Sequence, residues 1–493
     1  MLYETVKPIA RVALTWYYRS LSVAGRSRIP ATGPIFLAVN HPNALVDALV
    51  VACVVPRRVH FTAKATIFSN PVVAAFLRSA GVIPLRRAAD EAKRVATPGA
   101  DQVDLGSDPN ALLKNGTNQV GVGSDPNSLL KNDATPNAKI DPARNADSFR
   151  AVSAALADCS AIVIFPEGKS HDQPQLAPLR TGLARMALLA RDSGVRGIKI
   201  IPLGLLFEQK ETPRSRVLIQ TGDAIDVDSL PVGERAVGVL TALVSERLNA
   251  VTLNFESSED AKRIAAVSET LAALIEPEDS IGRGGPSLSS VLALSRRADR
   301  VRQVLEGAVS AEFRERVEQF QTRMNTFRSR LEGERISAAD LSIDVGATVG
   351  ARFAVREALL AALLLPVSWW GRITHLVPIR IARWLALRGA RNRDEPAMNT
   401  LLFGVALVLL AYVLLTAAVW IFFGAWWALA FFVTLIPSAS SDLRYGDRAR
   451  RRTERMRAYL TFRQQPGMQS ELLAEAGWLR REAGMIEQLV SST

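Results

Sequence analysis

The sequence is poor in cysteine and histidine. It has two cysteines, Cys53 and Cys159, so a disulfide framework is excluded and a reducing compartment is indicated. The four histidines, at positions 41, 60, 171 and 375, lack zinc-ligand spacing, and no His-Glu-x-x-His occurs. Neither a Gly-x-Ser-x-Gly elbow nor a phosphate-binding Gly-x-x-x-x-Gly-Lys loop is present. We therefore expect no metal, no cofactor, no covalent serine mechanism and no nucleotide hydrolysis.

Acidic and basic residues are both absent from residues 401–437. One helix crosses a bilayer with about 20 residues, so the run is either one overlong span or two minimal ones, and Gly424 offers a turn between two. Arginines flank the run on both sides: Arg383, Arg388, Arg391 and Arg393 before it, and Arg444, Arg448 and Arg450 to Arg452 after it. This pattern predicts a hairpin over about 400–437 with both ends cytoplasmic. The alternative is a buried helical hairpin in a soluble core.

Positive charge exceeds negative charge, with a net charge of +12, and 48% of the residues are hydrophobic. This pairing favours contact with anionic membrane lipids, where each basic residue contributes roughly 1 kcal/mol. The arginines lie beside apolar runs and form no nucleic-acid-reading motif, so we expect no nucleic-acid partner. Residues 1–30 are interpreted as an amphipathic membrane-associated helix, since Ile9, Trp16 and Leu21 recur at helical spacing. An ordinary core helix is the alternative.

Short apolar runs alternate with helical patterns over residues 31–230. This alternation predicts an α/β domain with a mixed, mainly parallel sheet flanked by helices. Residues 91–142 interrupt the pattern with two near-copies of Gly-Ser-Asp-Pro-Asn and are interpreted as a low-complexity insertion. We expect a helical accessory region over 231–350, a membrane region over 355–440 and a basic helical tail over 441–493.

The most informative stretch joins a predicted strand, Ile35 to Val39, to a predicted helix that begins after Asn43. His41 follows the strand, and Asp47 falls near the first turn of the helix, where the helix dipole favours a carboxylate. Asp47 can accept the Nδ1–H of His41, which leaves Nε2 free to take a proton. The alternative is a loop histidine and a helix-capping aspartate with no joint task.

Asn40-His41 and Asp47 resemble the first motif of the glycerophospholipid acyltransferases, which include lysophosphatidate and glycerol-3-phosphate acyltransferases. Five residues separate His41 from Asp47, whereas four is the commonest spacing in that family. The resemblance implies that His41 is the general base and that Asp47 orients it. Asn40 is carried over with the motif as a substrate-binding residue.

Three further blocks follow in the order of that family. The second motif is resembled by Lys64 together with the stretch from Gly81 to Arg87. In the family, the final arginine of this motif contacts the phosphate of the acceptor. By position that residue is Arg87, with Arg86 as the fallback. Phe165-Pro-Glu167-Gly168 resembles the third motif, in which Glu167 helps to hold the glycerol moiety and Gly168 admits the substrate. Many members continue with Thr-Arg; here Lys169 supplies the positive charge. Ile200 to Gly204 resembles the fourth motif.

The resemblance implies a membrane-bound O-acyltransferase of phospholipid biosynthesis with its catalytic domain on the cytoplasmic face. The donor is acyl-CoA or acyl carrier protein. The acceptor it implies is 1-acyl-glycerol 3-phosphate or glycerol 3-phosphate. The apolar stretches slightly favour the lysophospholipid as the acceptor. The alternative is a catalytically silent acyltransferase-like protein that binds lipid or tethers partners at a membrane, for which the extra residue between His41 and Asp47 is the main support.

Overall fold

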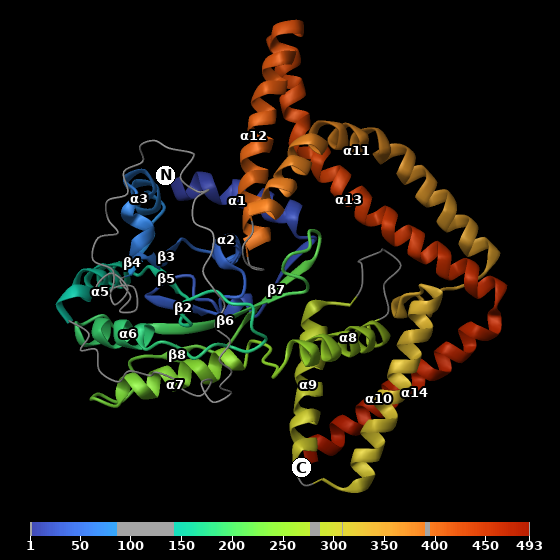
Figure 1. The fold of residues 1–493 in the computed structure, drawn as a ribbon, viewed down its shortest axis with the longest axis horizontal. Coiled ribbons are helices and arrows are strands. Elements are labelled where there is room, and N and C mark those ends of the chain that lie inside the picture. The colour runs from blue at the N-terminus through green and yellow to red at the C-terminus, as the bar shows by residue number, and fades with distance from the viewer. Residues whose placement is uncertain (1, 86–141, 277–285, 308, 390–394, 493) are drawn as a thin grey trace, which may run out of the picture.

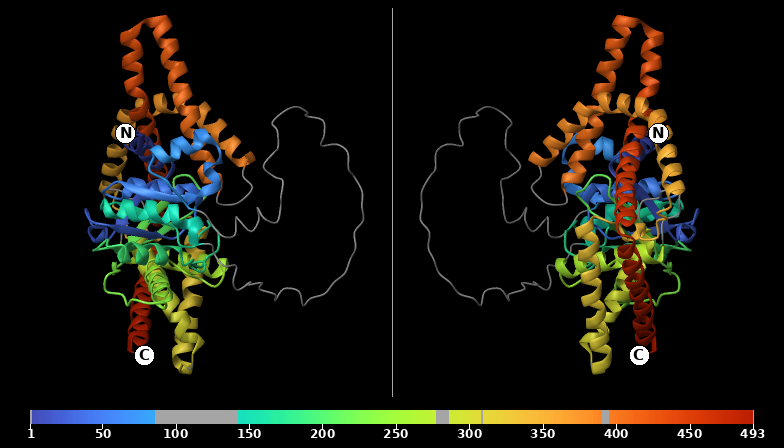
Figure 2. Two further views of the ribbon diagram at one scale, coloured as in Figure 1. Left: turned by 90° about the vertical axis from the view of Figure 1, so that its left-hand side faces the viewer. Right: turned by 90° about the vertical axis from the view of Figure 1, so that its right-hand side faces the viewer.

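The computed structural model describes residues 2–85, 142–276, 286–307, 309–389 and 395–492. The chain forms an α/β domain, a group of long helices beside it, and a helical hairpin that rises from one end of the molecule (Figure 1). The C-terminus lies at the opposite end from the hairpin, as the side views in Figure 2 show. The predicted insertion at 91–142 lies almost wholly outside the described residues.

The sheet of the α/β domain has the strand order β1-β7-β6-β2-β5-β3-β4, with the short β8 also paired to β6. Strands β6, β2, β5, β3 and β4 pair in that order and are parallel to one another. Strand β1 is parallel to β7, whereas β7 and β8 are antiparallel to β6. The strands are β1 (Ser20–Ala24), β2 (Ile35–Val39), β3 (Val59–Lys64), β4 (Ile83–Leu85), β5 (Ala161–Ile164), β6 (Lys199–Phe207), β7 (Arg216–Thr221) and β8 (Ile225–Asp226). The predicted fold class, a mixed and mainly parallel sheet, is confirmed.

Helices cover both faces of the sheet. In β2, Ile35, Leu37 and Val39 point to one face, where they pack with α1 (Leu2–Tyr17) and α2 (Ala44–Val54). Phe36 and Ala38 point to the other face, against α5 (Pro142–Ala157), α6 (Gly182–Asp192) and α7 (Ala236–Asn249). Successive side chains of a strand alternate between faces, so an all-apolar strand must be buried on both sides. That burial fixes the position of the site residues that follow β2.

The α/β domain extends beyond the predicted bounds of 31–230. Strand β1 pairs with β7, and Leu240 and Val244 of α7 are part of the core beneath the sheet. Helix α1 buries Leu14 and Tyr17 in the core shared with α2, whereas Ile9 of the predicted apolar stripe is 41% exposed. The first helix is therefore packed against the domain along one side only. Its membrane contact stays a prediction.

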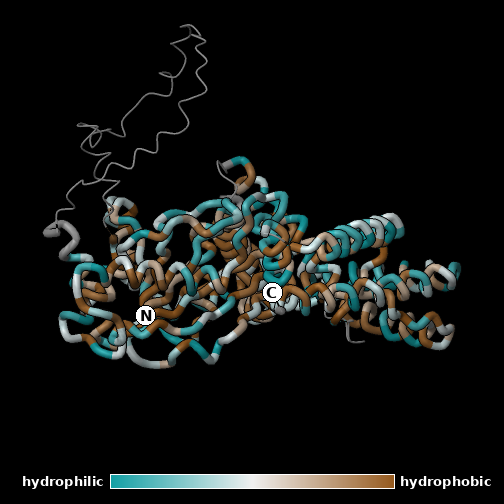
Figure 3. Tube along the Cα trace, turned by 90° about the horizontal axis from the view of Figure 1, so that it is seen from below, coloured by the Kyte–Doolittle hydropathy of each residue, from teal (hydrophilic) through white to brown (hydrophobic). Residues whose placement is uncertain are grey.

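A second group of helices follows the α/β domain. It comprises α8 (Ser258–Ile275), α9 (Leu288–Glu306), α10 (Ala311–Glu334) and α14 (Pro466–Ser492). Their apolar faces form a separate core around Met324, Phe327 and Leu479. Figure 3 shows hydrophilic residues along one of the outlying helices and hydrophobic residues along another.

The hairpin is built from α12 (Glu395–Phe423) and α13 (Ala425–Gln464), which meet at Gly424 with φ 88°. Only glycine adopts this conformation without strain, so the chain turns where the charge-free run has its central glycine. Helix α11 (Ala347–Gly389) packs against both. A Cβ at Gly371 would lie 2.2 Å from the backbone oxygen of Ser438, which shows how closely α11 and α13 approach. Among the described residues, one helix, Ala397–Phe423, is long and apolar enough to cross a membrane.

Candidate active site

The candidate residues gather at one edge of the sheet. Strands β2, β3 and β5 are neighbours and parallel, so the residues that follow them meet at the same edge. His41 follows β2, Lys64 ends β3, and Glu167 comes shortly after β5. Crevices outside the carboxyl ends of parallel strands are the usual binding sites of open α/β sheets.

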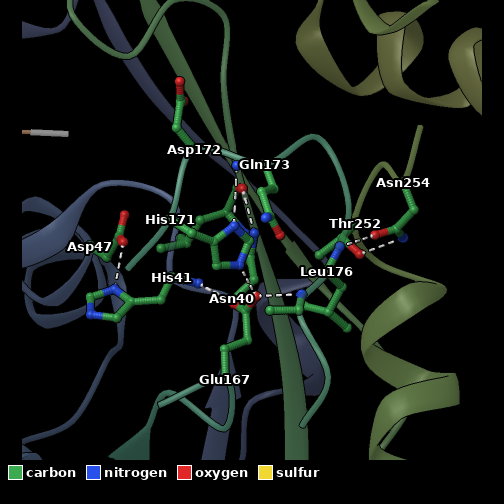
Figure 4. Close-up of polar contacts among 12 residues, drawn as sticks. Asn40, His41, Asp47, Glu167, His171, Asp172, Gln173, Leu176, Thr252 and Asn254 are labelled. Carbon is green, nitrogen blue, oxygen red and sulfur yellow. Dashed lines mark hydrogen bonds and ion pairs between the residues drawn. The ribbon is translucent and has the colours of Figure 1, made fainter. Parts of the chain in front are cut away.

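His41 and Asp47 form a direct hydrogen bond. The Nδ1 atom of His41 lies 2.9 Å from Oδ2 of Asp47 (Figure 4), and the Asp47 side chain is fully buried while that of His41 is 18% exposed. An ionised Asp47 accepts a hydrogen bond from Nδ1–H of His41, and this tautomer has its lone pair on Nε2. Within the described residues, no hydrogen-bond partner is found for Nε2. The ring also stacks on Phe165, with the centroids 4.0 Å apart, so its plane is fixed.

The five-residue spacing between His41 and Asp47 is accommodated by an irregular start to α2. Ala44 has φ 46°, in the left-handed region, and the backbone N–H of Val46 donates to the carbonyl of Asn43 at 3.1 Å. The backbone N–H of Asn43 donates to Oδ2 of Asp47 at 2.7 Å. One residue in the left-handed region thus takes up the extra length, and the His41–Asp47 contact is kept. A left-handed alanine costs about 1–2 kcal/mol.

The electrostatics of Asp47 are set by its burial. Removal from water raises the pKa of Asp47 above its usual value, and hydrogen bonds from His41 and from the Asn43 amide act in the opposite direction. Only Oδ2 accepts these bonds; Oδ1 of Asp47 is buried without a partner in the described part of the chain. Both hydrogen bonds to this carboxylate thus come to the oxygen that faces His41.

Glu167 connects His41 to the loop that follows β5. Its side chain is almost fully buried; Oε1 accepts the backbone N–H of His41 at 2.7 Å, and Oε2 accepts that of Ala177 at 2.8 Å. Oε2 also bonds Nε2 of His171, whose own backbone N–H donates to the carbonyl of His41 at 3.3 Å (Figure 4). Both carboxylate oxygens are thus bound by the chain itself. In this geometry Glu167 joins the residues that follow β2 to the loop that follows β5.

The other residues carried over from the family motifs have different surroundings. The side-chain amide of Asn40 pairs with the backbone of Leu205 in β6, at 2.7 and 3.1 Å, and so extends the sheet rather than facing solvent. Gly168 has φ 79° in the turn after β5, and Lys169 next to it is exposed. Lys64 ends β3 at the same edge. Arg86 and Arg87 directly follow β4 in the sequence but lie outside the described residues.

Three residues at this edge were not among the predicted site residues. His171 was noted only as a histidine without zinc spacing, although its position four residues after Glu167 places it within reach of that carboxylate. Asp172 pairs with Lys210 at 2.8 Å and links the loop to the residues after β6. The hydroxyl of Tyr18 accepts from the Asn43 side chain at 3.2 Å, a contact between segments for which no local pattern gives a signal.

Comparison with known proteins finds similar proteins among the acyltransferases. Residues 20–206 match the model of the family described as Acyltransferase. The chain is 28% identical to glycerol-3-phosphate O-acyltransferase 1 of Saccharomyces cerevisiae over 49% of its length, and 38% identical to glycerol-3-phosphate O-acyltransferase 2 of that yeast over 18%. An uncharacterized acyltransferase of Schizosaccharomyces pombe is 25% identical over 46% of the chain.

These matches cover 38%, 12% and 39% of the relatives' own lengths, so the chain spans less than half of each curated relative that it matches. A solved structure, the 1-acyl-sn-glycerophosphate acyltransferase PlsC of Thermotoga maritima, aligns with a TM-score of 0.32 and 13% identity over 50% of this chain and 79% of its own. The family match spans β1 to β6 and includes His41, Asp47 and Glu167. By sequence, this part of the chain is similar to the acyltransferase family.

Proposed function

We propose that this chain is a membrane-bound glycerolipid O-acyltransferase. The observation that carries the proposal is the hydrogen bond of 2.9 Å between His41 and the buried Asp47, at the carboxyl edge of a parallel sheet. A thioester donor, acyl-CoA or acyl carrier protein, is already activated, so an acceptor hydroxyl attacks it directly once a base removes the proton. The arrangement needs no protein nucleophile.

The reaction runs as a single acyl transfer with His41 as general base. The acceptor hydroxyl gives its proton to Nε2 of His41 while its oxygen attacks the thioester carbonyl. Asp47 stabilises the resulting imidazolium through Nδ1–H. The carbon–sulfur bond then breaks, the oxygen ester remains on the acceptor, and the thiolate leaves with the proton returned by His41. Stacking on Phe165 and the Glu167 bond to the His41 backbone keep the ring in place.

Glycerol 3-phosphate is the acceptor that we propose to test first. The sequence motifs do not separate it from 1-acyl-glycerol 3-phosphate, since both present a phosphate and a nearby hydroxyl. The names of the two yeast relatives move the preference from the lysophospholipid to glycerol 3-phosphate. We assign the phosphate to cationic residues at the ends of β3 and β4, namely Lys64 and Arg87 with Arg86 beside it. Lys169 is a further cation beyond β5.

We also propose that the α12–α13 hairpin anchors the enzyme in a bilayer with its α/β domain on the cytoplasmic face. The base of α12 is buried on the α/β domain, where Ala397 and Leu401 join the core under β2. Beyond it, α12 is largely exposed and apolar. The hairpin tip carries the exposed aromatic residues Trp420, Trp426 and Trp427, a residue type enriched at membrane–water interfaces. In this arrangement the start of α12 and the part of α13 after the charge-free run lie on the same side of the bilayer, as the flanking arginines predict.

The competing proposal, a catalytically silent lipid-binding or tethering protein, rests on the spacing between His41 and Asp47. The irregular turn at Ala44 accommodates that spacing while the contact is kept, which weakens this support. The test uses purified protein with labelled acyl-CoA and each acceptor in turn. We expect free thiol and labelled lysophosphatidate to appear only with glycerol 3-phosphate, and His41→Ala to abolish both, since a general base contributes about 10²–10⁴-fold. Thiol release that is independent of acceptor, or near-normal turnover by His41→Ala, would refute the mechanism.

A further inference from the structure

The link between β3 and β4 carries apolar side chains that no other part of the described structure covers. It consists of the short 3-10 helix η2 (Ala65–Ser69) and α3 (Pro71–Ser79). Ile67 is 50% exposed, Val72 76% and Phe76 49%, and Ala74 is the only buried residue of α3. Exposed apolar residues that are neighbours on one short element mark a contact surface, whereas single exposed ones need no explanation.

The chemistry of this link fits lipid better than water. Arg78 is the only charged residue of α3, and its guanidinium lies over the ring of Phe68, 5.9 Å from the centroid. A helix of nine residues is marginal in water by itself, so most of its stability must come from packing of its apolar side chains. A short element with exposed apolar side chains and a cation at its end can place the side chains below the lipid headgroups while the cation stays among them.

The position of α3 favours the same partner. Both views agree that α3 and α1 lie at the end of the α/β domain from which the hairpin rises (Figures 1 and 2). The base of α12 packs on α2, so this end of the domain is continuous with the start of the hairpin. A bilayer crossed by the exposed part of α12 would therefore meet the domain at this end. Leu45 of α2, 43% exposed, adds to the apolar surface of the domain.

We propose that η2 and α3 form a membrane-binding surface that inserts into the interfacial region of the bilayer crossed by the hairpin. The inference rests on the proposed membrane anchoring of α12. Because η2 begins directly at Lys64, where β3 ends, this surface holds the carboxyl edge of the sheet at the membrane. An ester formed at His41 then enters the bilayer beside the site, without crossing water.

The test uses single-cysteine variants of the full chain labelled with an environment-sensitive fluorophore. Cys53 and Cys159 are first replaced by alanine and serine, and activity is checked. Val72→Cys reports on α3, Leu410→Cys reports on α12, and Val232→Cys is the matched control. Val232 is 84% exposed in the link between β8 and α7, away from the hairpin end. Each labelled protein is reconstituted into phosphatidylcholine–phosphatidylglycerol vesicles with and without nitroxide-labelled lipid.

We expect labels at 72 and 410 to show blue-shifted emission that nitroxide lipid quenches, and the label at 232 to keep its water-exposed emission in both vesicles. Quenching at 410 but not at 72 overturns the inference and leaves the anchor intact. A blue shift at 72 without quenching also overturns it, because protein rather than lipid then covers α3. If the label at 410 is not quenched, the proposed membrane anchoring of α12 is refuted, and so is the inference that rests on it.

Discussion

Replacement of Asp47 by asparagine separates catalysis from stability, because the structure predicts opposite effects on the two. The bonds from His41 Nδ1–H and from the Asn43 N–H both go to Oδ2 of Asp47. In asparagine the group at that place is either the carbonyl oxygen, which carries no charge to stabilise an imidazolium, or the NH2 group, which puts the ring proton of His41 on Nε2. In either case His41 is a weaker base. We expect kcat/KM to fall about 10²–10⁴-fold, or roughly 3–5 kcal/mol in the activation barrier.

The free energy of unfolding should not fall with the activity. Burial raises the pKa of Asp47 in the folded chain above its unfolded value, so between these two pKa values the folded chain binds more protons than the unfolded one. Stability due to this group therefore decreases as the pH rises through that window, because the folded chain bears the cost of ionising a buried carboxyl. Asp47→Asn removes that cost. Its Tm at neutral pH should equal or exceed that of the wild type, with the difference shrinking as the pH is lowered.

The measurements are acyl transfer with labelled acyl-CoA and thermal unfolding in one detergent over a pH series. Asp172→Asn is the matched control: it removes a carboxylate at the same edge that pairs with Lys210 at the surface, so we expect little change in either quantity. Near-normal turnover by Asp47→Asn would refute the orienting role of this carboxylate. A large fall in Tm together with activity would instead make Asp47 a structural anchor.

Three further changes test other parts of the site and the anchor. Ala44→Gly should raise the free energy of unfolding by about 1 kcal/mol in denaturant titration, because glycine adopts the left-handed region without strain; a decrease contradicts the strained turn. His171→Ala should lower kcat/KM by about 10–100-fold, the worth of a hydrogen bond to a charged acceptor, and His171→Gln, which keeps a donor, should lose less. Equal losses would exclude a donor role. A reporter inserted at Gly424 and one after Arg452 should report opposite sides of the membrane; the same side for both contradicts the crossing hairpin.

The parts of the fold that depend on local pattern could be predicted from the sequence. Strand β2 has the bounds predicted for it, Ile35 to Val39, because a buried strand in a mainly parallel sheet is a continuous apolar run with polar ends. Strand β1 could not be found this way. Its sequence, Ser-Leu-Ser-Val-Ala, is short and mixed, and it is a strand because β7, almost 200 residues later, pairs with it.

The arginines beside the hairpin show the same limit. Their number predicts a cytoplasmic flank, but the sequence gives no partner for any one of them. In the structure Arg451 makes two hydrogen bonds to the buried Asp340, at 2.8 and 2.9 Å, and Arg448 does the same with Glu357. These pairs join α13 to segments about 90 and 110 residues earlier. Arginines that were interpreted by composition alone therefore also fix the long helix to the protein, and fewer of them remain for lipid headgroups.

Some features of the candidate site could also be predicted from the sequence and others could not, and the difference bears on where the acceptor binds. The residues could be identified from the motifs, and the His41–Asp47 contact from the strand and helix around it. The surroundings of Glu167 could not, since they depend on a loop that returns to His41. Oε2 of Glu167 has two partners and Oε1 has one, so at most one acceptor position, on the nearly buried Oε1, is left for a glycerol hydroxyl. We therefore propose that the acceptor is held mainly through its phosphate, by the cations at the ends of β3 and β4.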